Sequence, residues 1–145
     1  MRRTTVSLLC VGALVACDEP VGPPGEWEPS GVYGYLARIV AVPVVEGTLT
    51  LVVAADSSVT GTWELQRVPG SDPTLSVGPQ VGSGTLQGRL SATGISVDLN
   101  PGWADDNVLL SLDAKAYDQL SGTWDHSTLI GPVTGGPVQL RRRQR

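Results

Sequence analysis

Residues 59–64 read Val-Thr-Gly-Thr-Trp-Glu, and apolar and polar side chains alternate along them, which is typical of a strand with one buried face. In an extended strand, successive side chains point to opposite faces. Trp63 would therefore face inward beside Gly61, which leaves room for the ring, while Thr62 would face outward. Residues 120–125, Leu-Ser-Gly-Thr-Trp-Asp, repeat the pattern 61 positions later. The sequence thus predicts the same half-buried strand twice.

The repeat continues on both sides of this strand. Residues 49–51, Leu-Thr-Leu, precede the first copy at the spacing at which residues 110–112, Leu-Ser-Leu, precede the second. After a loop that is shorter in the second half, residues 84–89 are echoed by residues 136–141. Each half is therefore expected to contribute about four strands in the same order.

Period-two alternation continues almost everywhere after residue 30, and apolar residues nowhere keep helical spacing for three turns. The chain's 18 glycines and 11 prolines interrupt this pattern at short intervals. Short links such as Asp56-Ser57 and Asp118-Gln119 suit antiparallel hairpins. We expect about eight strands, near 31–41, 47–54, 57–66, 81–91, 94–99, 107–117, 119–127 and 135–143.

The fold class that follows is all-β. A single antiparallel meander of about eight strands loses its exposed edges most simply by closing into an up-and-down barrel, here built from two four-strand repeats. A two-sheet β-sandwich is the alternative. The outward positions carry hydroxyl, amide and charged side chains, which is the reverse of a transmembrane barrel. Residues 31–145 are therefore expected to form one water-soluble barrel domain.

The N-terminal region predicts attachment to a membrane. Two arginines precede an apolar run over residues 6–16, which is shorter than the roughly 20 residues that a spanning helix needs. The run ends in Leu14-Val15-Ala16-Cys17, which resembles the lipobox of bacterial lipoproteins. The resemblance implies that residues 1–16 are a signal peptide and that Cys17 carries lipid. An ordinary signal peptide with an incidental cysteine is the alternative.

Residues 17–30 are expected to tether the barrel to that lipid. They are rich in proline, glycine and acidic residues and have no apolar periodicity, so the segment should stay extended. Trp27, its only large apolar residue, is expected to fold back onto the domain. The protein would then be lipid-anchored to a bacterial membrane in the cell envelope, with the domain facing the periplasm or the exterior.

Composition argues against nucleic acid and against thiol chemistry. Without residues 1–16 the chain would keep 8 basic and 14 acidic side chains, a formal charge of −6, whereas nucleic-acid binding needs clustered cations. The one basic cluster, Arg141–Arg145, is expected to be the solvated end of a last strand, with contact to anionic lipid or lipopolysaccharide as the alternative. With Cys10 removed and Cys17 lipidated, no thiol would be left for a disulfide or a zinc site.

Groups for catalysis are few. The single histidine is His126, and the sequence has no Gly-x-Ser-x-Gly motif that would supply a nucleophilic serine for it. Residues 105–107, Asp-Asp-Asn, lack the ligand spacing of a calcium-binding loop and are interpreted as a polar turn. Glu64 and Asp125, at matching outward positions, are explained by solubility. We therefore expect no enzymatic activity, no metal and no cofactor.

Gly61-Thr62-Trp63 and Gly122-Thr123-Trp124 resemble the Gly-x-Trp signatures of calycins, and Gly-Thr-Trp in particular is similar to the avidin family. Lipocalins usually carry the signature once, near the first strand and after a helix, whereas this chain has it on the third and seventh expected strands. The whole chain resembles short, Gly-rich bacterial lipoproteins. The calycin resemblance implies a barrel that holds a small ligand, but it transfers no ligand-binding residue.

Two function classes remain. The favoured one is a membrane-tethered envelope lipoprotein with a filled core and a structural or protein-interaction role, because nearly all inward positions are aliphatic. The alternative is lipocalin- or avidin-like binding of a small apolar or aromatic ligand in the barrel. His126 is interpreted as a rim histidine, half in water or bonded to a backbone carbonyl, or else as the polar handle of that cavity. The residues that would line the cavity are Trp63, Trp124, Tyr33, Tyr35 and His126.

Overall fold

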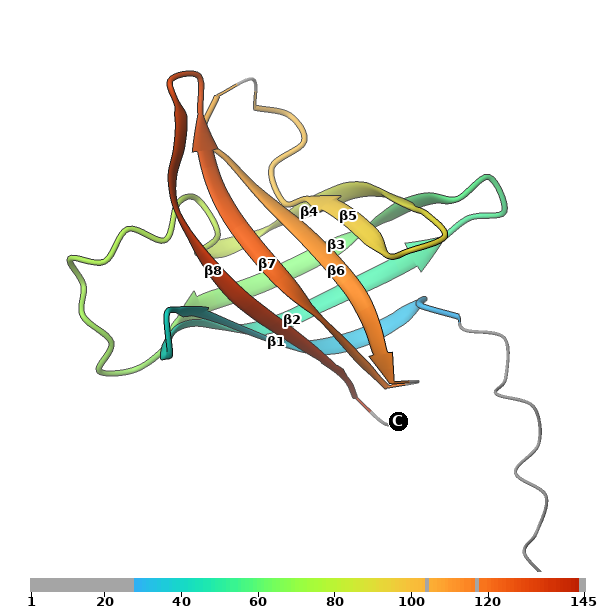
Figure 1. Cartoon of the computed structure of the whole chain (residues 1–145), viewed down its shortest axis with the longest axis horizontal. Helices are drawn as coiled ribbons and strands as arrows, with labels where there is room; N and C mark the ends of the chain where they lie inside the picture. Colours follow the sequence, from blue (N-terminus) through green and yellow to red (C-terminus); the bar gives the residue numbers. More distant parts are fainter. Residues whose placement is uncertain (1–27, 104, 117, 144–145) are drawn as a thin grey trace, which may run out of the picture.

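The structure, a computed structural model, describes residues 28–103, 105–116 and 118–143. Each strand is antiparallel to the next one in sequence, and the last strand pairs with the first (Figure 1). The predicted all-β meander and its closure into a barrel are confirmed, so the β-sandwich alternative is wrong. The eight strands are β1 (Gly31–Ile39), β2 (Val42–Val53), β3 (Ser58–Arg67), β4 (Gly82–Leu90), β5 (Ile95–Asp98), β6 (Asn107–Ala116), β7 (Gln119–Thr128) and β8 (Gly131–Arg142).

Two strands begin earlier than predicted because each contains a bulge near its start. β2 begins at Val42 rather than near residue 47, and its register with β1 shifts so that Val44 and Val45 are both fully buried. β8 begins at Gly131 rather than near residue 135, and its register with β7 shifts beside Ser127. A bulge adds a residue to one strand and so breaks the alternation from which the strands were predicted.

The register repeats between the two halves. Leu49 on β2 lies opposite Trp63 on β3, which lies opposite Gly84 on β4. The same order occurs on β6, β7 and β8, as Leu110, Trp124 and Gly136. The sequence repeat is therefore also a repeat of strand pairing.

Inward side chains fill the barrel. Trp63 is 5% exposed and Trp124 is fully buried, whereas Thr62 and Thr123, one residue earlier on each strand, are exposed. The predicted faces of β3 and β7 are therefore confirmed. The largest fully buried side chains include Trp124, Tyr33, Leu49, Leu51, Leu86, Ile95, Leu99, Leu110, Leu112, Leu120 and Leu140.

The barrel has two different ends. The links β1–β2, β3–β4, β5–β6 and β7–β8 lie at one end, which we call the loop end, and the long β3–β4 connection over residues 68–81 belongs to it (Figure 1). The start of β1 and the end of β8 lie together at the other, which we call the tether end. The predicted signal peptide, Cys17, Trp27 and most of the predicted tether lie outside the described residues. Within the described part of the chain, no helix is long and apolar enough to cross a membrane.

Candidate functional site

Trp63 is bonded to the barrel's own backbone. Its indole Nε1 donates a hydrogen bond to the carbonyl oxygen of Leu99, just beyond β5, at 2.7 Å. To reach it, the ring crosses β4 at Gly84, where a Cβ would lie 2.8 Å from a ring carbon. The glycine that makes room for the ring is therefore Gly84 on the neighbouring strand, and the expectation that Gly61 does so is wrong.

Trp124 repeats this arrangement in the second half. Its Nε1 donates to the carbonyl oxygen of Arg38 on β1 at 2.9 Å, and it lies opposite Gly136 on β8. Arg38 and Leu99 are 61 positions apart, so the bond follows the sequence repeat. Each tryptophan thus ties its own strand to the strand beyond its neighbour, which is a structural role.

The glycines of the Gly-Thr-Trp motif serve the close approach of backbones instead. A Cβ on Gly61 would lie 1.8 Å from the carbonyl oxygen of Thr50, and one on Gly122 would lie 1.8 Å from that of Ser111. No side chain fits at either position. Both glycines therefore allow the backbones of neighbouring strands to approach closely at equivalent places in the barrel wall.

Tyr33 lies at the tether end. Its hydroxyl donates to the carbonyl oxygen of Pro29 at 2.7 Å, and the guanidinium of Arg142 lies 5.4 Å from its ring centroid. Arg142 also donates to the Tyr33 hydroxyl oxygen at 3.1 Å and to the carbonyl oxygen of Glu28. This arginine clamps the segment that enters β1, so the expectation of a solvated cluster over residues 141–145 is wrong at Arg142.

Tyr35 lies at the loop end, where it holds the β3–β4 connection. Its hydroxyl donates to Oε1 of Gln80 at 2.7 Å, and Nε2 of Gln80 donates to the carbonyl oxygen of Val77 at 2.7 Å. Gln80 is fully buried, and burial raises the pKa of Tyr35 above its ordinary value, so the phenol stays a neutral donor. Sequence reasoning missed Gln80 because residues 68–81 show no alternation.

His126 lies beneath the same connection. Its Nε2 is 2.5 Å from Oδ1 of Asp106 in the β5–β6 link, and its Nδ1 is buried without a hydrogen-bond partner. Gly78 lies against the ring, where a Cβ would be 2.7 Å from His126 Cγ. The expected rim histidine is thus 7% exposed and bonded to a carboxylate rather than to a backbone carbonyl. Among the described residues, no group of three His, Cys, Asp or Glu residues is placed to hold a metal ion.

The five residues predicted to line a ligand cavity therefore do not form one site. Tyr33 lies at the tether end, and the two tryptophans are bonded to backbone carbonyls of β1 and of the residue after β5. Tyr35 and His126 meet residues 77–80 at the loop end. Their role in ligand binding stays a prediction.

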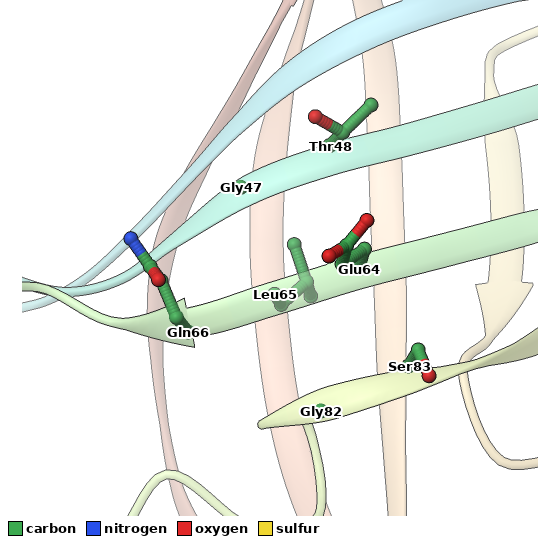
Figure 2. Close-up of a pocket in the computed structure, with 7 residues that line it drawn as sticks. All are labelled: Gly47, Thr48, Glu64, Leu65, Gln66, Gly82 and Ser83. Carbon is green, nitrogen blue, oxygen red and sulfur yellow. The ribbon is translucent and has the colours of Figure 1, made fainter.

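A groove lies instead on the outer wall, over β2, β3 and β4. Its first hollow, of about 520 Å³, has Glu64 of β3 between Thr48 of β2 and Ser83 of β4 (Figure 2). A second, of about 470 Å³, shares these three residues. A third, of about 400 Å³, shares Ser83 with both and extends to Asn100 and Trp103 beyond β5. We call these three hollows together the outer groove.

Four glycines border the outer groove. Gly47 and Gly82 line the first hollow, Gly84 lines the other two and Gly102 lines the third, so backbone rather than side chain is exposed there. The alternation in the sequence shows that Glu64 and Thr62 face outward. It does not show that they share a depression, because this depends on which residues lie opposite one another.

Comparison with known proteins supports the fold. No family model matches the chain, and no curated protein sequence matches it. Among solved structures, a rhizavidin–biotin complex matches with a TM-score of 0.55 and 14% sequence identity, covering 81% of this chain and 94% of that one. The barrel is avidin-like. The predicted resemblance to avidins is thus confirmed for the architecture, while the lipoprotein resemblance stays a prediction.

Proposed function

We propose that the chain is a lipid-anchored binding module of the bacterial envelope that acts through the outside of its barrel. The filled interior carries this proposal. A ligand inside the barrel would have to displace Trp63 or Trp124, and removing a buried tryptophan from a core costs about 3–5 kcal/mol. Each indole also donates to a backbone carbonyl that would lose its partner.

The position of the tether supports the same function. The chain enters β1 at the tether end, where Arg142 binds both Tyr33 and the carbonyl oxygen of Glu28. With an anchor at Cys17, this end would face the membrane. The loop end would point away from it, and the outer wall would be open to partners in the envelope.

Fractionation of cells that make the full chain tests the anchor. Replacement of the lipid-bearing cysteine, Cys17→Ala, should move the protein from the membrane to the soluble fraction, because each buried methylene of an acyl chain contributes about 0.8 kcal/mol. Cys10→Ala is the control and should leave the protein in the membrane. Unchanged membrane partitioning of Cys17→Ala would contradict the anchor.

In-cell photo-crosslinking tests the working surface. A photoreactive residue at Thr85, on the outer wall of β4, should capture a partner that is absent when the probe replaces Val40, an exposed residue at the β1–β2 link. No specific adduct at Thr85, nor at Thr62 beside it, would contradict binding through this wall.

A second candidate function is the binding of a small molecule at the loop end. The buried Nδ1 of His126, which has no hydrogen-bond partner, favours it, because buried polar groups usually have partners. The avidin-like neighbour was solved with biotin, so its fold can accept a small ligand. Native mass spectrometry of the purified chain should then show a co-purifying molecule that His126→Ala loses. A wild-type spectrum with the mass of the protein and its lipid alone would contradict this candidate.

A further inference from the structure

We infer that the outer groove binds an extended, neutral oligosaccharide. The inference rests on the proposed function, because it takes the outside of the barrel as the working surface. It names a ligand class for that surface from four observations: the hydroxyl rows, the exposed tryptophan, the charge of the lining and the difference between the two halves of the barrel.

Hydroxyl groups form aligned rows across the groove. Thr50, Thr62 and Thr85 lie directly opposite one another on β2, β3 and β4. In the next row, Glu64 lies between Thr48 and Ser83. Within the described residues, no side-chain hydrogen bond or ion pair engages these six groups. They are free to donate to and accept from a polyhydroxylated ligand.

Trp103 supplies an aromatic surface at one end of the groove. Its side chain lines the third hollow and the residue is 63% exposed, which is unusual for so large an apolar group. Its backbone is fixed, because its N–H donates to the carbonyl oxygen of Asn100 at 3.0 Å and its own carbonyl accepts from Nδ2 of Asn107 at 2.9 Å. An exposed indole on a held backbone suits the flat, C–H-rich face of a pyranose ring, since the π-face of the indole is negative.

The charge and shape of the groove further restrict the chemical class of ligand that it can bind. No lysine or arginine is among the described residues that line the three hollows, so a phosphate or another anion has no cation to bind. The hollows are open and continuous through Ser83, from β2 to the residues after β5. Such a shape accepts a chain of several sugar units better than one compact molecule.

The repeat shows that this surface is not a by-product of the barrel. Most inner residues match between the halves, and outer Thr62 and Glu64 also have like counterparts in Thr123 and Asp125, but three other outer positions of the groove differ. Leu109, Gly135 and Pro137 on the second half occupy the places of Thr48, Ser83 and Thr85. Only the first half therefore carries both rows complete, and the second half provides matched control positions.

Isothermal titration of the full chain, in a detergent without a sugar headgroup, tests this inference. The probes are the β-1,4-linked hexamers of glucose and of N-acetylglucosamine. We expect at least one of them to bind, and we expect Trp103→Ala and Glu64→Ala each to weaken its binding about tenfold or more. Asp125→Ala, at the matching position of the other half, should change binding by less than about twofold. All these positions are exposed, so thermal unfolding should stay close to wild type.

Each other outcome overturns the inference. No heat of binding with either hexamer at millimolar concentration would exclude the ligand class. Equal loss in Asp125→Ala and Glu64→Ala would place binding elsewhere. A protein captured by the probe at Thr85, together with no binding of either hexamer, would overturn the saccharide assignment and leave the proposed function standing. If neither hexamer binds and the photoreactive probe captures no partner, both this inference and the proposed function are wrong.

Discussion

At the scale of single residues, the account depends on which side chains hold the barrel and which are free. Trp63 and Trp124 should each cost about 3–5 kcal/mol of unfolding free energy when replaced by alanine, because a large buried ring and a satisfied indole donor are lost together. Chemical unfolding measures this. Thr62→Ala and Thr123→Ala are the matched controls and should cost less than about 1 kcal/mol. If the threonine variants lost more unfolding free energy than the tryptophan variants, the assignment of inner and outer faces would be wrong.

The motif glycines lead to a second prediction at this scale. Gly122→Ala should destabilise the barrel by about 1–3 kcal/mol or more, because its Cβ would lie 1.8 Å from the carbonyl oxygen of Ser111 and both groups belong to the barrel wall. Gly102→Ala is the control, since a Cβ there meets nothing within 4 Å. Thermal unfolding of the two variants compares them. A harmless Gly122→Ala would mean that the strands do not approach as closely as described.

At the scale of elements, the β2–β3 link contains a pH-sensitive turn, in which Asp56 accepts hydrogen bonds from Ser58. Hydrogen bonds from the hydroxyl and the backbone N–H of Ser58 lower the pKa of Asp56. A carboxyl whose pKa is lowered by folding stabilises the folded state above its ordinary pKa, and this contribution disappears as the pH falls through the lowered value. Unfolding of Asp56→Ala below about pH 4 should therefore depend less on pH than that of the wild type. If the stability of both proteins fell equally with pH in this range, the stabilising role of the Asp56–Ser58 turn would be wrong.

The β3–β4 connection should depend on Gln80. Gln80→Ala leaves the buried Tyr35 hydroxyl without its acceptor, which should cost about 1–3 kcal/mol and expose residues 68–81 to protease. Gln87→Ala, on the outer wall, is the control and should leave the digestion rate unchanged. Equal digestion of the Gln80 variant and the wild type would mean that this hydrogen bond does not hold the connection.

How far the sequence predicts these elements depends on whether alternation survives in them. β3 and β7 were predicted almost to the residue because Trp63, Trp124 and their neighbours alternate without a break. The starts of β2 and β8 were missed because a bulge buries both Val44 and Val45, and because glycine and proline at 131–137 resemble a loop. No periodicity marks Gln80, and the hydroxyl rows become visible only when the register aligns three strands.

At the scale of the whole molecule, the two halves share an interior and differ outside. The tryptophan hydrogen bonds, the close backbone approaches at the motif glycines and the register all repeat, so the inside of the barrel serves stability in both halves. The complete hydroxyl rows and Trp103 occur on one side only, and we propose that specificity for a partner resides there. We therefore propose that the inner wall holds the fold and that the outer wall binds a partner.

Hydrogen exchange of the indole N–H groups, measured by NMR, tests this separation most directly. We expect slow exchange for Trp63 and Trp124, whose buried indoles donate to backbone carbonyls of the barrel, and fast exchange for Trp103, which is 63% exposed. Single tryptophan replacements assign the signals. If the signals of Trp63 and Trp124 exchange as fast as that of Trp103, the interior is open to water and the barrel is not filled.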